Sequence, residues 1–149
     1  MLTFEKTLLP HLGKTAKYAG FYFIDTFQEN GIDLSKEQWL VLKKLHMQDG
    51  PIQNDLAFIT NRSKTSLTRL INTMEKKELV FRVASKKDKR INHIYLSNLG
   101  KGTFLKAIPI INKIMKDLQK GIPTNDLLAA MDVLSKIQKN IDKKNFIKL

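Results

Sequence analysis

The residues best suited to chemistry lie on one face of a predicted helix between residues 63 and 74. At about 100° per residue, Thr65, Arg69 and Asn72 share this face, with Thr68 beside them. The opposite face is apolar. Short hydroxyl side chains permit close approach to DNA, and Arg pairs with guanine or with phosphate. The pattern therefore suits a helix that enters a DNA major groove, although a solvated amphipathic helix has the same pattern.

A second group of charged residues lies at the tip of a predicted β-hairpin. Two runs with the alternating pattern of strands, Leu79–Ala84 and Ile91–Leu96, flank a short charged segment. Its basic residues are Lys86, Lys87, Lys89 and Arg90. A basic hairpin tip suits the minor groove, where narrow stretches concentrate negative potential. The alternative interpretation is a solvated turn.

Positive charge is unevenly distributed along the chain. The formal net charge is +12 over 149 residues, which indicates a polyanionic partner, either nucleic acid or an acidic membrane surface. Residues 62–101 hold 11 basic and 3 acidic residues, a balance of +8, whereas residues 1–30 balance to zero. The charge is concentrated, as a binding surface requires.

Helix start and stop signals place the polar face in a helix-turn-helix. Ser35-Lys-Glu-Gln38 is a capping box, which predicts a helix over residues 35–48. A short helix over residues 53–58 follows, and Asn61 can end it in the left-handed conformation. Ser63 then caps the helix with the polar face. Because the basic hairpin comes next, this order predicts a winged helix-turn-helix with a two-stranded β wing.

Predicted helices flank this lobe on both sides. One covers about residues 11–30, a long one covers about residues 98–120 and is expected to kink at Pro109, and a last one covers residues 125–141 with Thr124 as its cap. Their apolar stripes exceed what one small domain can cover, which predicts a two-fold dimer in which these helices interleave. Such a dimer would set two recognition helices apart on a pseudo-palindromic site.

The chain resembles the MarR family of bacterial transcriptional regulators over about residues 14–141. The residues that carry the resemblance are Leu34–Trp39, Asp55–Ala57, Ser63-Lys64, Leu67–Leu70, Glu75–Val80, and the wing pattern of Asp88, Arg90, Leu96, Ser97 and Gly100. The chain departs from the family at Asn61 and Glu78, where members usually carry Gly. Asn61 is an easy substitute, whereas Glu78 requires a strained or altered helix end.

The resemblance implies a dimeric repressor or activator, often released from DNA by a small, frequently phenolic, ligand. It implies contacts to the major groove and its phosphates from the start of the recognition helix: Ser63, Lys64, Thr65, Thr68 and Arg69. In the wing, Arg90 would enter the minor groove, and Asp88 would hold Arg90 or a neighbouring Arg through an ion pair. Lys86 and Lys87 are expected to lie near phosphates.

We interpret residues 1–149 as a single, mainly α (α+β) domain. The expected DNA-binding lobe covers residues 34–97, and the expected dimerisation helices lie in residues 1–33 and 98–149. The predicted function is that of a dimeric, sequence-specific DNA-binding transcriptional regulator, with repression favoured. A nonspecific nucleoid-type DNA binder and a winged-helix protein-interaction module remain alternatives. Replacement of Arg69 separates these hypotheses, because only a sequence-specific DNA-binding protein would lose its sequence preference.

Other classes of site and function find little support in the sequence. Cysteine is absent, which excludes disulfides, thiol redox sensing and cysteine-ligated metals. The histidines His11, His46 and His93 are isolated, so no metal site is expected. No phosphate loop, serine elbow or His–carboxylate constellation indicates an enzyme, and no cofactor is expected. Without a long apolar run or a signal peptide, a cytoplasmic protein without membrane contact is the expectation.

A small aromatic effector is an expected partner beside DNA, but its pocket is unassigned. The aromatic side chains Tyr18, Phe21, Tyr22 and Trp39 fit the wall of such a pocket, at the junction of the dimer helices and the DNA-binding lobe. A plain hydrophobic core explains them equally well. No feature of the sequence selects a ligand or an operator.

Overall fold

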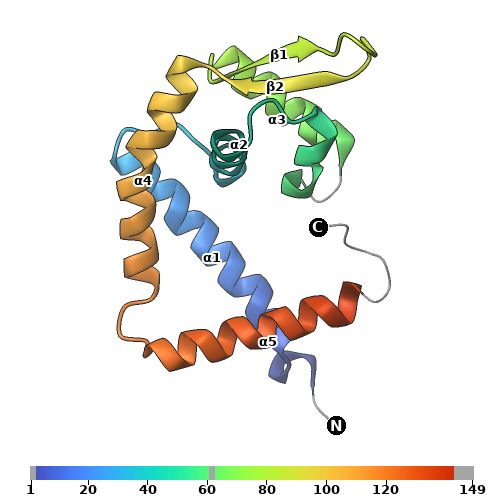
Figure 1. Cartoon of the computed structure of the whole chain (residues 1–149). Helices are drawn as coiled ribbons and strands as arrows, with labels where there is room; N and C mark the ends of the chain where they lie inside the picture. Colours follow the sequence, from blue (N-terminus) through green and yellow to red (C-terminus); the bar gives the residue numbers. More distant parts are fainter. Residues whose placement is uncertain (1–2, 61–62, 143–149) are drawn as a thin grey trace. The chain divides into compact units, whose positions relative to one another are not determined.

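The predicted helices and hairpin follow one another in the expected order, after a short 3₁₀ helix (Figure 1). The computed structural model describes residues 3–60 and 63–142. Its elements are the 3₁₀ helix η1 (Phe4–Lys6), α1 (Leu8–Glu29), α2 (Lys36–Met47), the 3₁₀ helix η2 (Gln53–Thr60), α3 (Lys64–Lys76), β1 (Val80–Ala84), β2 (Asn92–Leu96), α4 (Asn98–Leu118) and α5 (Thr124–Asp142). The mainly α class with a two-stranded wing is confirmed.

The chain divides into two compact units, Met1–Ile114 and Met115–Leu149. The first unit holds α1, the winged helix-turn-helix and most of α4. The second holds the end of α4 and all of α5. The hydrophobic core and the candidate interface both belong to the first unit.

The capping box predicted for α2 is present. The Ser35 hydroxyl accepts from the Gln38 amide, and the Gln38 side-chain oxygen accepts from the Ser35 amide, both at 3.1 Å. Gln38 is buried, and its oxygen also accepts from the Lys77 ammonium at 3.2 Å. A local start signal therefore doubles as a link from α2 to the end of α3.

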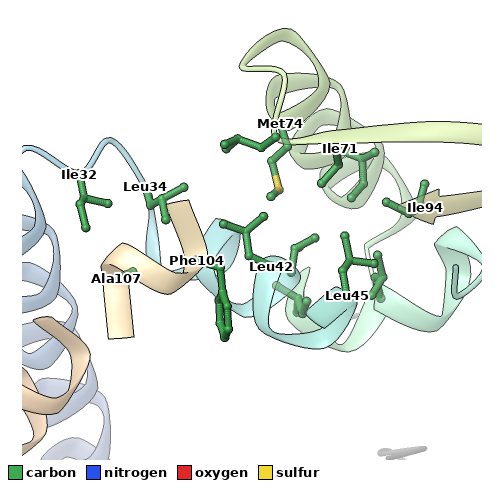
Figure 2. Packing of buried hydrophobic residues seen from close by; sticks show 14 of the residues in the cluster. Ile32, Leu34, Leu42, Leu45, Ile71, Met74, Ile94, Phe104 and Ala107 are labelled. Carbon is green, nitrogen blue, oxygen red and sulfur yellow. The ribbon is translucent and has the colours of Figure 1, made fainter. Parts of the chain in front are cut away.

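The core of the first unit packs α3 against α2. Figure 2 shows Ile71 and Met74 of α3 directed toward Leu42 and Leu45 of α2, with Ile94 of β2 beside them. Four of these five residues are fully buried, and Leu45 is 5% exposed. Burial of such side chains contributes about 1.5–3 kcal/mol each. The apolar stripe of α3 thus fixes which way its polar face points.

The end of α3 forms a Schellman motif around a residue that is not glycine. Glu78 has φ 59°, in the left-handed region. Its amide donates to the Glu75 carbonyl at 2.9 Å, and the Leu79 amide donates to the Met74 carbonyl at 3.0 Å. The sequence prediction of a strained or altered helix end at Glu78 is confirmed.

Two residues of the wing pattern, Ser97 and Gly100, hold the base of the wing. The Ser97 hydroxyl donates to the Glu78 carbonyl at 2.5 Å and accepts from the Gly100 amide at 2.9 Å. A Cβ on Gly100 would lie 2.0 Å from the Leu79 carbonyl oxygen. Ser97 and Gly100 therefore let α4 start directly against the end of α3, which is a structural reason for their place in the pattern.

Some boundaries in the first half of the chain differ from the prediction. α1 begins at Leu8, earlier than expected, with Pro10 in its first turn, where a missing N–H is tolerated. The helix predicted over residues 53–58 is the 3₁₀ helix η2, and it continues to Thr60. Asn61, which was predicted to end it, lies outside the described residues.

In the second half, the prediction that Thr124 caps the last helix is wrong. Thr124 is already the first residue of α5, and the Pro123 carbonyl accepts from the Leu127 amide at 3.2 Å. Pro fixes its own φ near the helical value, so the turn forms one residue earlier than the hydroxyl suggested. α4 runs through Pro109, and a kink there stays a prediction.

Candidate nucleic-acid interface

The outward face of α3 carries the residues predicted to contact the major groove. Lys64, Thr65, Thr68 and Arg69 are all exposed, whereas Leu67 among them is 1% exposed. This division follows from the amphipathic pattern, because the apolar stripe is held in the core. α3 therefore presents a row of hydroxyl and basic side chains to solvent.

Ser63 begins this face as the cap of α3. Its hydroxyl accepts from the Ser66 amide at 3.2 Å, and the Thr60 hydroxyl donates to the Ser63 carbonyl at 3.1 Å. Because the cap uses only a lone pair, the Ser63 hydroxyl proton stays free to be donated. Lys64 and the positive end of the helix dipole add positive potential at the same end.

The tip of the wing presents Arg90 on a carboxylate support. Asp88 Oδ1 accepts from Arg90 Nε and Oδ2 accepts from Nη2, both at 3.2 Å, and Oδ1 also accepts from the Arg90 amide at 3.0 Å. The Arg90 side chain is 91% exposed. Hydrogen bonds from the Arg90 side chain, and then from its backbone amide, hold the pKa of Asp88 below its ordinary value. Assignment of Arg90 to the minor groove stays a prediction.

The other basic residues of the wing tip are exposed. Lys86 and Lys87 lie in the bend that follows β1, and the Lys87 amide donates to the Ser85 hydroxyl at 3.3 Å. β1 and β2 pair antiparallel with Val80 opposite Leu96 and Ala84 opposite Asn92, so the tip begins directly after the ladder. The wing and α3 belong to one unit, which brings two basic surfaces onto the same lobe.

Sequence reasoning missed three polar residues behind these surfaces: Gln53, Glu75 and Arg82. Arg82 lies opposite Ile94 in the ladder, and its side chain is only 18% exposed. The alternating pattern of β1 already placed Arg82 on the same face as Val80. A charged group on the inward face of a strand requires partners, and this signal could have revealed the site.

The aromatic residues considered for an effector pocket do not share one environment. Tyr18 and Phe21 are 57% and 54% exposed on α1, with Lys14 Nζ and Lys17 Nζ over their rings. Trp39 instead packs between core rings, 6.2 Å from Phe23 and 6.4 Å from Phe104 by ring centroid. Trp39 Nε1 is buried without a hydrogen-bond partner in the described residues.

Other kinds of site receive no support from the described residues. Over residues 3–60 and 63–142, no three or more His, Asp or Glu side chains gather as a metal ion would require. None of the helices in this part of the chain combines the length and apolar character of a membrane span.

Comparison with known proteins finds a family model that resembles the lobe. Residues 34–91 match the sequence model of the MarR family. Over this lobe the chain is similar to the MarR family. The match begins next to the α2 capping box and ends just after Arg90, so it covers α3 and the wing tip.

Several solved structures share this fold over more than nine-tenths of the chain. The transcriptional regulator SlyA is 22% identical with a TM-score of 0.80, over 95% of this chain and 99% of that one. Bordetella bronchiseptica BpsR, whose DNA binding is regulated by 6-hydroxynicotinic acid, is 17% identical with a TM-score of 0.82, over 93% and 97%. S. aureus MepR in complex with DNA is 22% identical with a TM-score of 0.73, over 94% and 99%.

Proposed function

We propose that this protein is a regulator of the MarR family, a dimeric repressor that reads a pseudo-palindromic operator. The observation that supports the proposal is that one lobe carries two exposed basic surfaces, the outward face of α3 and the Arg90 tip of the wing. In this proposal Lys64, Thr65, Thr68 and Arg69 contact the major groove. Arg90 enters the minor groove, and Lys86 and Lys87 lie along the phosphates.

The proposal is tested by DNA binding at two salt concentrations. The DNA is the promoter region beside the protein's own gene, with a scrambled duplex of equal composition as control. A preference of roughly 10³ or more for the promoter, with a steep salt slope, is expected for a specific regulator that makes several phosphate contacts. Equal affinity for both duplexes would contradict the proposal and would indicate a nonspecific DNA binder.

Dimerisation in this proposal uses the terminal helices. α1 exposes Leu8 and Leu9, which are 55% and 65% exposed, and α5 exposes Leu128 and Met131, which are 55% and 54% exposed. Large apolar side chains in such density favour burial against a second copy. Sedimentation is expected to give twice the 17.2 kDa chain mass at micromolar concentration. A monomer that still prefers the promoter would contradict the proposal that the protein acts as a dimer.

Release by an aromatic effector is the last part of the proposal. Among residues 3–60 and 63–142, the buried Trp39 Nε1 has no hydrogen-bond partner. This supports release by an effector, because an unpaired buried donor is costly and a ligand acceptor would satisfy it. The DNA binding of BpsR is regulated by 6-hydroxynicotinic acid, which makes that acid the first probe. Trp39 is the only tryptophan, so its fluorescence reports binding. If neither the fluorescence nor DNA release responds to this acid or to simple phenols, effector control of this class is contradicted.

A further inference from the structure

A polar network joins the wing to the recognition helix behind the DNA-facing surfaces. Arg82 of β1 donates from Nε to the Gln53 side-chain oxygen at 3.0 Å, and its Nη1 is ion-paired with Glu75 of α3. Gln53 is the first residue of η2. One guanidinium therefore connects the wing strand with both helices of the helix-turn-helix.

The other end of the Gln53 amide reaches the DNA-facing side of α3. Gln53 Nε2 donates to Thr68 Oγ1 at 3.4 Å, and Thr68 Oγ1 donates its single proton to the Lys64 carbonyl at 2.9 Å. A hydroxyl has one proton and two lone pairs. Thr68 is left with one lone pair and a methyl group for any further contact.

We infer that Gln53 and Arg82 are positioning residues for operator reading, an inference that rests on the proposed function. The network holds the wing in register with α3, so that the tip and the reading face address neighbouring grooves together. Within this network the Thr68 hydroxyl proton is already donated to the Lys64 carbonyl, so Thr68 cannot donate a hydrogen bond to a base. Of the lone pair and the methyl group that Thr68 has left, we assign the methyl to contact with a thymine, whose C5-methyl lies in the major groove.

The test separates the two arms of the Gln53 amide with two substitutions. Gln53→Glu keeps an oxygen that accepts from Arg82 but removes the donor to Thr68. Gln53→Met keeps the side-chain length and removes both arms. Gln28→Met is the matched control, because Gln28 is an exposed residue of α1 outside the lobe. Thermal unfolding of each variant checks that the fold is retained.

The measured quantity is the ratio of promoter to scrambled affinity. Gln53→Met is expected to lower this ratio about tenfold or more, the size of one mismatched base pair, with little change in salt slope. Gln53→Glu is expected to lower the ratio as well, although its arm to Arg82 is intact, because Thr68 loses its support. Gln28→Met is expected to leave the ratio unchanged. If the folded Gln53 variants keep the wild-type ratio, the inference is overturned.

A second measurement tests the reading of thymine by Thr68. Each thymine of the operator is replaced in turn by deoxyuracil, which lacks only the methyl group. One position is expected to weaken binding by the wild-type protein but not by Thr68→Ser, which keeps the hydroxyl and lacks the methyl. If no operator position shows this difference between the wild type and Thr68→Ser, contact between Thr68 and a thymine methyl group is refuted. A wild type without promoter preference would instead refute the proposed function, before any variant is compared.

Discussion

Two arginines of the same hairpin have opposite surroundings. Arg82, in the middle of β1, is 18% exposed, forms an ion pair with Glu75 and donates a hydrogen bond to Gln53. Arg90, at the tip, is 91% exposed and is held by Asp88, two residues away. The same side chain thus builds the lobe at one position and presents charge to solvent at the other. What distinguishes them is how far along the chain their partners lie.

The largest expected difference between these arginines is in how much their replacement lowers the free energy of unfolding of the protein. Arg82→Met removes a partly buried charge and leaves Glu75 and Gln53 without their partner, which is expected to lower the free energy of unfolding by about 2 kcal/mol. Arg90→Met removes an exposed, solvent-screened ion pair, so the free energy of unfolding is expected to change little. Urea unfolding of both variants measures the difference. Equal losses of stability would show that Arg82 contributes no more to folding than Arg90 at the tip.

A smaller change in the opposite direction is expected at the base of the wing. Glu78→Gly relieves the left-handed backbone of a non-glycine residue, which costs of order 1–3 kcal/mol. Glycine also loses more entropy on folding, so the net gain in unfolding free energy is expected to be about 1 kcal/mol. The same urea experiment measures it. A loss of stability would mean that the Glu78 side chain contributes more than its backbone strain costs.

At the tip, Arg90→Ala is expected to act on binding rather than on folding. Loss of one cation from the minor groove should weaken binding to promoter and scrambled DNA alike and reduce the salt slope by about one. Binding isotherms at several salt concentrations measure this slope. An unchanged slope would contradict a DNA contact by Arg90.

The smallest expected effect concerns the protonation of Asp88. Its pKa lies below the ordinary 3.8 because of Arg90, so the ion pair favours the folded state above that value and is lost as pH falls through the lowered pKa. Carboxyl NMR should report a midpoint below 3.8 in the wild type and a return toward 3.8 in Arg90→Ala. An unchanged midpoint in that variant would show that the Asp88–Arg90 pair does not persist in solution.

Local signals allowed much of this lobe to be predicted. The Ser35 and Ser63 caps, the stripe of α3 and the alternation of the hairpin all act within a few residues, and so does the Asp88–Arg90 pair. The network of Gln53 and Arg82 joins residues 29 positions apart, so only the folded chain brings them together. Thr124 was misplaced because Ser, Thr and Pro all suit helix starts, and packing decides between neighbours.

The central claim is that α3 reads bases while the wing adds affinity, and Arg69→Ala tests it most directly. Affinity of wild type and variant is measured for promoter and scrambled duplexes at one salt concentration. Loss of one good Arg–guanine pair is expected to lower the promoter preference about tenfold or more, with scrambled affinity little changed. Equal weakening on both duplexes would contradict the claim and would leave α3 as a phosphate-binding helix.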